Sequence, residues 1–178
     1  VLALLKEPDL DLQRAAGKFI IEMPGPSITK ALAEQLGQLG ADAQVVLLSA
    51  LEGRGDKAAS PYVAQVAGSA SEPVRIAAIE ALAVLGDASS VELLAKASAD
   101  DSAAGRAAID SLGRLSGPAV AGALVAVAKS DAAVPVRVNA IGALVNRHET
   151  EAIDVLLAVA ADGNPDIRQA AYKALGAL

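Results

Sequence analysis

The sequence predicts an all-α fold, a solenoid built from consecutive pairs of short helices. Apolar residues recur at three- and four-residue steps, which is the period of one helix face. The same pattern returns along the whole chain with a mean period of 31 residues. The connections are short and polar, and none has the composition of a domain linker. A pair of such short helices cannot bury its own apolar surface, so each pair needs a neighbour above and below it.

The clearest unit is the segment 73–100, which holds two amphipathic helices joined by a Gly-Asp turn. Gly86 follows the last apolar position of the first helix, where a helix end favours a residue that tolerates positive φ. Asp87 can then cap the second helix by accepting from its free N–H groups. Glu92 and Lys96 are four residues apart with the acid first, which is the favourable order on a helix surface.

Aligning the copies on one position shows how regular the repeat is. The equivalent positions are spaced by 31, 31, 30, 32 and 31 residues, and they are Ala15, Val46, Ala77, Ala107, Asn139 and Ala170. The position five residues later is aliphatic in every copy: Ile20, Leu51, Leu82, Leu112, Leu144 and Leu175. A register kept through loops is typical of stacked supersecondary units. We expect this aliphatic column to be interior, so that Leu82→Ala or Leu112→Ala costs about 2–5 kcal/mol of stability.

The copies divide the chain into about five repeats, which together form one predicted domain, residues 1–178. The repeats are 9–39, 40–70, 71–101, 102–132 and 133–163, followed by a partial repeat, 164–178. The first and fourth are alike, because in both a proline follows a glycine and opens the second helix, where a missing N–H costs nothing. The chain starts on the tail of a second helix and ends on an unpaired first helix, so we expect a fragment of a longer array.

Composition narrows the classes of function. Hydrophobic residues make up 53% of the chain but aromatic residues only 2%, so the core must consist of Ala, Leu, Val and Ile. The sequence contains no Cys, which excludes disulfides and thiolate metal sites. No apolar run reaches the roughly 18–20 residues that span a bilayer. The formal net charge of −6 argues against a nucleic-acid partner, which needs clustered Lys and Arg.

Three segments carry a resemblance to a known family: PVRIAAIEALAVLGD (73–87), PVRVNAIGALVNRHE (135–149) and PDIRQAAYKALGAL (165–178). They resemble HEAT-like repeats, in particular the short bacterial repeats first associated with phycobilisome lyase subunits. The resemblance covers nearly the whole chain and implies a right-handed, HEAT/armadillo-like superhelix. It also implies that the first helices lie outside and that the second helices line a concave, partner-binding groove. The phase of the second helices then predicts a protein-binding strip at Thr29, Gln65, Glu92, Lys96, Val125, Asp154 and Ala158.

Arginines form a second column. Arg75, Arg137 and Arg168 align, and two readings are open. They can form a basic ladder for an anionic ligand, or each can bond an acid or carbonyl of the adjoining repeat, which suits the guanidinium fork. We favour the structural reading. Arg54 and Arg147 replace leucine or methionine at the end of the first helix, and we expect their stems to cover apolar surface with the charged heads in water.

Two polar residues stand out singly. His148 begins a sequence like HExxH, but Ala152 stands where the second histidine is required, so a helix-end role is favoured over metal binding. Asn139 occupies a column that is otherwise Ala or Val. Its amide needs hydrogen-bond partners if it is buried, so it bonds backbone across a repeat junction or marks a site, and we favour the first.

No catalytic constellation is discernible: we find no nucleophile–base pair, phosphate loop, calcium loop or cofactor motif. The first hypothesis is therefore a non-enzymatic scaffold or adaptor that binds another protein through a solenoid surface. The alternatives are a regulatory or lyase-type subunit that acts with an enzyme or chromophore protein, and a structural spacer in a multidomain protein.

Overall fold

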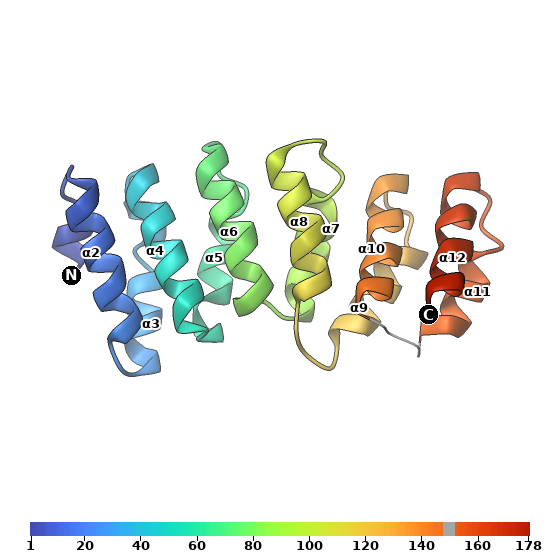
Figure 1. Ribbon diagram of the computed structural model, residues 1–178, viewed down its shortest axis with the longest axis horizontal. Coiled ribbons are helices and arrows are strands. Elements are labelled where there is room, and N and C mark those ends of the chain that lie inside the picture. Colours follow the sequence, from blue (N-terminus) through green and yellow to red (C-terminus); the bar gives the residue numbers. More distant parts are fainter. Residues whose placement is uncertain (148–151) are drawn as a thin grey trace. The chain divides into compact units, whose positions relative to one another are not determined.

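The computed structural model describes residues 1–147 and 152–178 (Figure 1). Within these residues the elements are α-helices and short 3-10 helices, with no strand. The first helices of the pairs are α2 (Leu10–Glu22), α4 (Ala41–Arg54), α6 (Glu72–Leu85), α8 (Ala103–Arg114), α10 (Val134–Asn146) and α12 (Pro165–Ala177). The second helices are α1 (Leu2–Leu5), α3 (Pro26–Ala33), α5 (Ser60–Val66), α7 (Val91–Ala97), α9 (Val120–Lys129) and α11 (Ile153–Val159). The 3-10 helices are η1 (Leu36–Gln38), η2 (Lys57–Ala59) and η3 (Ala88–Ser90). The predicted all-α solenoid of paired helices is confirmed.

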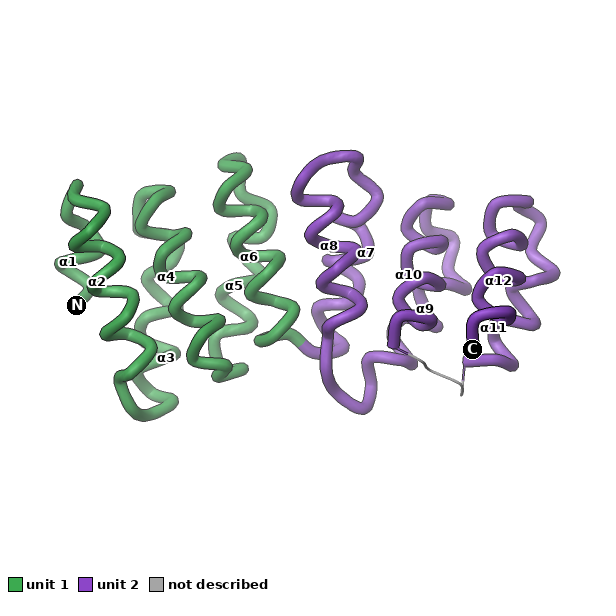
Figure 2. The backbone as a smooth tube through the Cα atoms, in the orientation of Figure 1, with its two compact units in different colours: residues 1–86 green, residues 87–178 purple. Residues whose placement is uncertain are grey.

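The chain divides into two compact units, Val1–Gly86 and Asp87–Leu178 (Figure 2). The boundary falls between the two helices of the predicted third repeat, 71–101. Repeats and compact units are therefore different divisions of the same chain. That all 178 residues fold as one domain remains a prediction.

Within each unit, packing is mainly between neighbours in sequence. In unit 1, α4 packs on α2 and on α6, while α5 packs on α6 (Figure 1). In unit 2, α10 packs on α8, α9 and α12, α7 packs on α8, and α11 packs on α12. When contacts are of this kind, the free energy of unfolding is approximately the sum of contributions from each repeat and from the interfaces between adjacent repeats.

The predicted aliphatic column forms the centre of this core. Its first five members are fully buried, with 0% of each residue exposed: Ile20, Leu51, Leu82, Leu112 and Leu144. The sixth, Leu175, is half-buried. Small residues lie where first helices approach: a Cβ added to Gly17 of α2 would lie only 2.9 Å from Val46 Cγ1 of α4.

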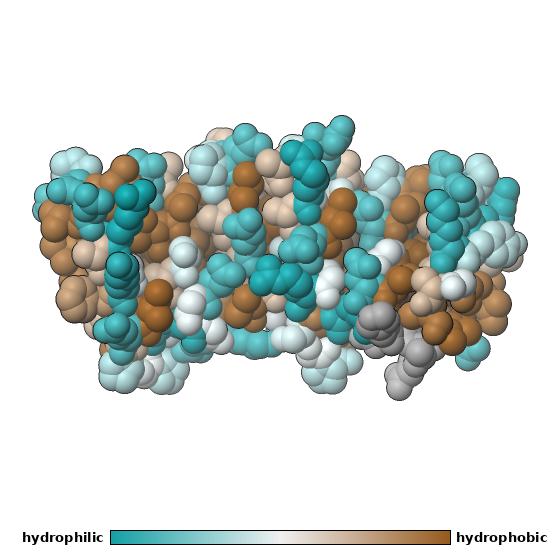
Figure 3. All heavy atoms as spheres, in the orientation of Figure 1, coloured by the Kyte–Doolittle hydropathy of each residue, from teal (hydrophilic) through white to brown (hydrophobic). Residues whose placement is uncertain are grey.

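The position four residues after the aligned column that begins with Ala15 shows how side-chain size and burial are related. Ala50 and Ala81 are 2% and 0% exposed, whereas Phe19, at the same position of α2, is 60% exposed. Figure 3 shows hydrophobic, brown side chains among hydrophilic, teal ones on one face of unit 1. Alanine at this position is thus covered in α4 and α6, whereas Phe19 of α2 is not.

The turns between paired helices follow the prediction in part. Gly55 ends α4 with a φ of 65°, and Asp56 then accepts a hydrogen bond from Ala58 N–H. Asp87 accepts from Ser89 N–H, as expected of a cap. The prediction of a positive φ at Gly86 is wrong, because its φ is −74° and the backbone leaves the helix in an extended conformation. Proline opens α3 as predicted, but in the fourth repeat it lies in a turn before α9.

Candidate protein-binding surface

The arginine column lies at the start of the first helices and binds backbone. Arg75 Nη1 donates to Ser69 O at 2.8 Å, and Arg168 Nη1 donates to Asp162 O at 2.8 Å and Gly163 O at 2.9 Å. These carbonyls belong to the loops that follow the second helices. The structural reading of the column is therefore confirmed for these arginines, because their donors bind the chain itself.

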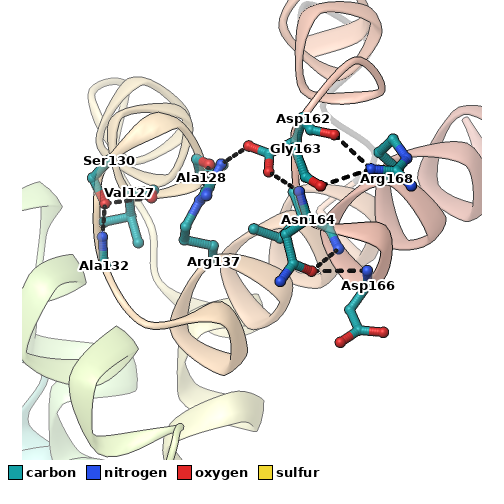
Figure 4. Close-up of polar contacts among 11 residues, drawn as sticks. Val127, Ala128, Ser130, Ala132, Arg137, Asp162, Gly163, Asn164, Asp166 and Arg168 are labelled. Carbon is teal, nitrogen blue, oxygen red and sulfur yellow. Dashed lines mark hydrogen bonds and ion pairs between the residues drawn. The ribbon is translucent and has the colours of Figure 1, made fainter.

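Arg137 makes the same kind of contact and adds an ion pair (Figure 4). Its Nε donates to Ala128 O at 2.9 Å, near the end of α9, while its Nη2 pairs with the Asp162 carboxylate beyond α11. The side chains of Arg137 and Asp162 are only 14% and 20% exposed. Hydrogen bonds from Asn164 N–H and from Arg137 lower the pKa of Asp162. One guanidinium thus ties together the ends of two successive second helices.

The other repeats fill this column differently. Gln13 Nε2 donates to Glu7 O at 2.7 Å, and Gln44 Nε2 donates to Leu36 O at 2.9 Å. The fourth repeat has Gly105 here, and a Cβ on that residue would lie 1.8 Å from Asp100 O, so the loop itself occupies the space. Neither glutamine was predicted to have this role, although the repeat register aligns both with Arg75.

The prediction that the heads of Arg54 and Arg147 lie in water is wrong. Arg54 Nε donates to Thr29 Oγ1 at 3.0 Å and Nη2 donates to Gly25 O at 3.0 Å. Its Nη1 reaches the carbonyl oxygens of Ile20 and Met23 at the end of α2. Arg147 likewise donates to Leu115 O after α8. The last carbonyls of a helix have no partner within that helix, so a cation from the next repeat can satisfy them.

The sequence did contain a signal for these contacts. The two helices that are bound in this way, α2 and α8, are the ones followed by a Gly-Pro turn. Each turn places its glycine at positive φ, 101° at Gly25 and 136° at Gly117. In each case the arginine stands at the corresponding end of the next first helix.

Asn139 is half-buried and joins two helices of unit 2. Its Nδ2 donates to Ser98 O at 2.9 Å and to Ser98 Oγ at 3.1 Å, at the end of α7. The favoured reading, a backbone bond across a repeat junction, is confirmed. The bond spans from the fifth repeat to the third.

The residues of the predicted binding strip differ in how exposed they are. In unit 1, Gln65 is exposed, but Thr29 is fully buried beneath the Arg54 contact, so its prediction as a surface residue is wrong. In unit 2, Val125 is half-buried. The remaining members, all in unit 2, are exposed: Glu92, Lys96, Asp154 and Ala158.

Two of these residues border a groove of about 480 Å³ within unit 2. The groove lies between α7 and α9 and reaches the start of α10. Its lining is mostly small and apolar: Ala88, Ser89, Val91, Glu92, Ala95, Lys96, Ala123, Ala126, Val127, Ser130, Ala132 and Val136. At its edge, Lys96 Nζ pairs with Glu92 Oε1 at 2.7 Å, which lowers the pKa of Glu92.

The described residues contain no group of three or more His, Cys, Asp or Glu side chains placed to hold a metal ion. Among the helices that they form, none combines the length and the apolar character needed to cross a membrane. His148 lies outside the described residues, so the interpretation of that residue remains a prediction.

Comparison with known proteins places this geometry in a family. A family model for HEAT repeats matches three overlapping stretches, residues 29–113, 61–137 and 123–178. The chain belongs to the HEAT-repeat family. The predicted resemblance is thereby confirmed. No curated protein sequence matches the chain.

Solved structures with a similar fold include two engineered proteins and a phycocyanin lyase complex. Two engineered proteins from the Northeast Structural Genomics Consortium align with TM-scores of 0.52 and 0.53 at 20% and 18% identity. The alignments cover 98% of this HEAT-repeat chain and 93% and 95% of theirs. The complex of CpcE and CpcF of phycocyanin lyase from Nostoc sp. PCC7120 aligns with a TM-score of 0.52 at 20% identity, covering 98% of this chain and 74% of the other. At these identities the likeness concerns the fold.

Proposed function

We propose that this HEAT-repeat chain is a non-enzymatic scaffold that binds another protein, and that an apolar segment of that protein occupies the groove between α7 and α9. The observation that carries the proposal is the character of α9 beside the groove. From Val120 to Ala128 this helix has no polar side chain, yet Gly122 and Ala126 are exposed. A helix that is hydrophobic all round is normally buried. Such a helix at the edge of an apolar groove is suited to being covered by a partner.

The chemistry of the groove favours a protein segment over a small polar ligand. Small-molecule sites combine apolar walls with a few convergent polar groups that fix orientation. Here the groove offers mainly alanine and valine, and Ser130 Oγ already donates to Val127 O at 2.8 Å. Short side chains allow a partner's backbone to come close, and aliphatic side chains of the partner can fill the space between the two helices. The exposed Glu92–Lys96 pair at the edge of the groove offers one negative and one positive charge to polar groups of the partner that flank these aliphatic side chains.

A scaffold function is also consistent with how the chain uses its charged groups. Arg54, Arg75, Arg137 and Arg168 all bind backbone carbonyls or a carboxylate of the chain. Donors used in this way hold repeats together and are not offered to a substrate. The proposal therefore includes no catalytic residue, cofactor, metal or nucleic-acid partner.

The experiment uses a displayed library of short random peptides, selected on the whole chain. We expect enriched peptides to carry aliphatic residues and to lose affinity on Ala126→Arg, which places a long charged side chain in the groove. Ala15→Arg is the matched control, because Ala15 is also an exposed helical alanine but lies on α2. Since the chain has no cysteine, a fluorophore on Ala126→Cys reports occupancy at one position only.

Two outcomes would count against the proposal. Binders that are insensitive to Ala126→Arg would place the binding surface elsewhere. A library that yields no enriched peptide would favour the spacer alternative.

The lyase-type alternative rests on the likeness to the phycocyanin lyase complex of CpcE and CpcF. It predicts that the chain, mixed with a free tetrapyrrole or with a chromophore protein, changes the absorption spectrum of the pigment. An unchanged spectrum over a range of chain concentrations would remove this alternative.

A further inference from the structure

The connection between α11 and α12 contains a chemically reactive dipeptide. Asp162 is the only aspartate of the chain that is followed by glycine, and no asparagine precedes a glycine. An Asp-Gly pair is prone to cyclise, because glycine has no Cβ to hinder its amide nitrogen and leaves the backbone free to rotate. The fold does not require this glycine, since its φ is not positive and an added Cβ would meet nothing within 4 Å.

The reaction at such a pair uses only the chain and water. The Gly163 amide nitrogen attacks Cγ of the protonated Asp162 carboxyl group, and one carboxyl oxygen leaves as water, with its own proton and the amide proton. The product is a five-membered succinimide. Water that opens the ring at Cγ restores aspartate, whereas water that opens it at the former main-chain carbonyl gives isoaspartate. The final mass and oxidation state are those of the starting chain.

Both carboxylate oxygens of Asp162 are bound in the folded chain (Figure 4). Oδ1 accepts from Asn164 N–H at 2.8 Å, and Oδ2 pairs with Arg137 Nη2. These two bonds also lower the pKa of Asp162, and an ionised carboxylate reacts poorly because its oxygen cannot leave as water. Ring closure turns the side chain away from a staggered rotamer, so the same two bonds oppose it.

The main chain around the reactive bond is fixed as well. Arg168 Nη1 donates to Asp162 O at 2.8 Å and to Gly163 O at 2.9 Å. On the other side, Asp162 N–H donates to Val159 O at 3.0 Å, at the end of α11. The peptide unit between Asp162 and Gly163 therefore cannot rotate toward the carboxyl group while Arg168 holds both carbonyls.

We propose that Asp162–Gly163 is a latent site of succinimide and isoaspartate formation, which Arg137 and Arg168 keep unreactive until the contact between α11 and α12 opens. Local opening of this kind precedes global unfolding in many folds. Isoaspartate carries one additional methylene in its main chain and a displaced carboxylate, so Arg137 does not regain its partner when the helices close again. The modification thus marks chains whose last repeat has opened.

The first test compares two sites in one wild-type chain, aged at neutral pH either folded or unfolded in urea. Isoaspartate is measured by peptide mapping with fragmentation that separates the two isomers. Asp101, which precedes Ser102, is the internal reference because its side chain is fully exposed. We expect Asp162 to react faster than Asp101 in the unfolded chain and more slowly in the folded chain. The same order in both states would overturn the proposal.

Arg137→Met removes the guanidinium and keeps an unbranched stem. It is expected to speed isoaspartate formation at Asp162 at least about tenfold, equivalent to about 1.4 kcal/mol, and to leave Asp101 unchanged. Leu112→Ala is the control, because it destabilises unit 2 at a fully buried site without removing a partner of Asp162. Equal acceleration by Leu112→Ala would show that overall unfolding governs the reaction and would refute the role of Arg137.

Gly163→Ala identifies the reacting bond. The structure has room for the added Cβ, so this variant is expected to fold and to suppress isoaspartate at Asp162 in the Arg137→Met background. Formation that continues at the same rate would contradict attack by the Gly163 nitrogen. If Arg137→Met fails to fold, the comparison of folded and unfolded wild type decides the question.

Discussion

Replacing Arg54 tests whether cations from one repeat hold the end of the preceding helix. Its head donates to Thr29 Oγ1 and to the carbonyl oxygens of Ile20, Met23 and Gly25. Three of these contacts are partly buried, and the one to Gly25 is exposed, so that carbonyl can turn to water. An acceptor left unpaired on burial costs about 1–3 kcal/mol. Since partly buried groups recover some hydration, we expect Arg54→Ala to lower the free energy of unfolding by about 2–4 kcal/mol.

The assay is urea unfolding followed by far-UV circular dichroism, with Arg54→Met as the matched variant. Methionine keeps an unbranched apolar stem but has no donor, so it separates the packing of the stem from the bonds of the head. We expect Arg54→Met to retain most of the loss seen with alanine. A loss below about 0.5 kcal/mol for Arg54→Met, the range of ordinary surface changes, would mean that the charged head contributes nothing and would refute the reasoning.

Four further changes test the packing and the inter-repeat contacts. Leu82→Ala is expected to cost about 2–5 kcal/mol in the same urea assay, because the side chain is fully buried; a loss below about 0.5 kcal/mol would contradict its interior position. Gly105→Ala is expected to lower the Tm, although alanine favours helix by about 1 kcal/mol, since its Cβ would lie 1.8 Å from Asp100 O; a higher Tm would show that the loop moves freely. Arg137→Ala is expected to lower the Tm and leave peptide affinity unchanged, and an unaltered Tm would contradict its structural role. Asp162→Asn tests pH dependence: the pKa of Asp162 is lowered in the folded chain, so its stabilisation is present above the unfolded value of about 3.9 and is lost as pH falls through the lower folded value. The stability difference between wild type and this variant should therefore shrink below about pH 4, and a difference that stays constant with pH would contradict the ion pair.

The sequence allowed the fold to be predicted because helix packing depends on the spacing of apolar residues. Leu51 and Leu82 were assigned to the interior from their place in a column, and both are fully buried. Side-chain heads that bridge repeats were harder to predict. The position of Arg54 indicated that its aliphatic stem lies along an apolar helix face. The contacts of its guanidinium, however, depend on where the turn at Gly25 positions the last carbonyl groups of α2. Thr29 was misplaced as well: it is fully buried, and its hydroxyl oxygen accepts from the Arg54 head.

The candidate groove was predicted only in part. Glu92 and Lys96 follow from helix phase, and both line the groove. On α9 the phase was one residue off: Val125 was expected at the surface and is half-buried, while Ala126 lines the groove. The gap between α7 and α9 depends on how two helices pack, which the composition of either helix alone does not determine.

The measurement that tests the central claim most directly is the dissociation constant of the tightest selected peptide for the wild-type chain, for Ala126→Arg and for Ala15→Arg. A scaffold that binds through the groove predicts at least about tenfold weaker binding to Ala126→Arg, equivalent to about 1.4 kcal/mol, and unchanged binding to Ala15→Arg. Equal affinity for all three chains would contradict it.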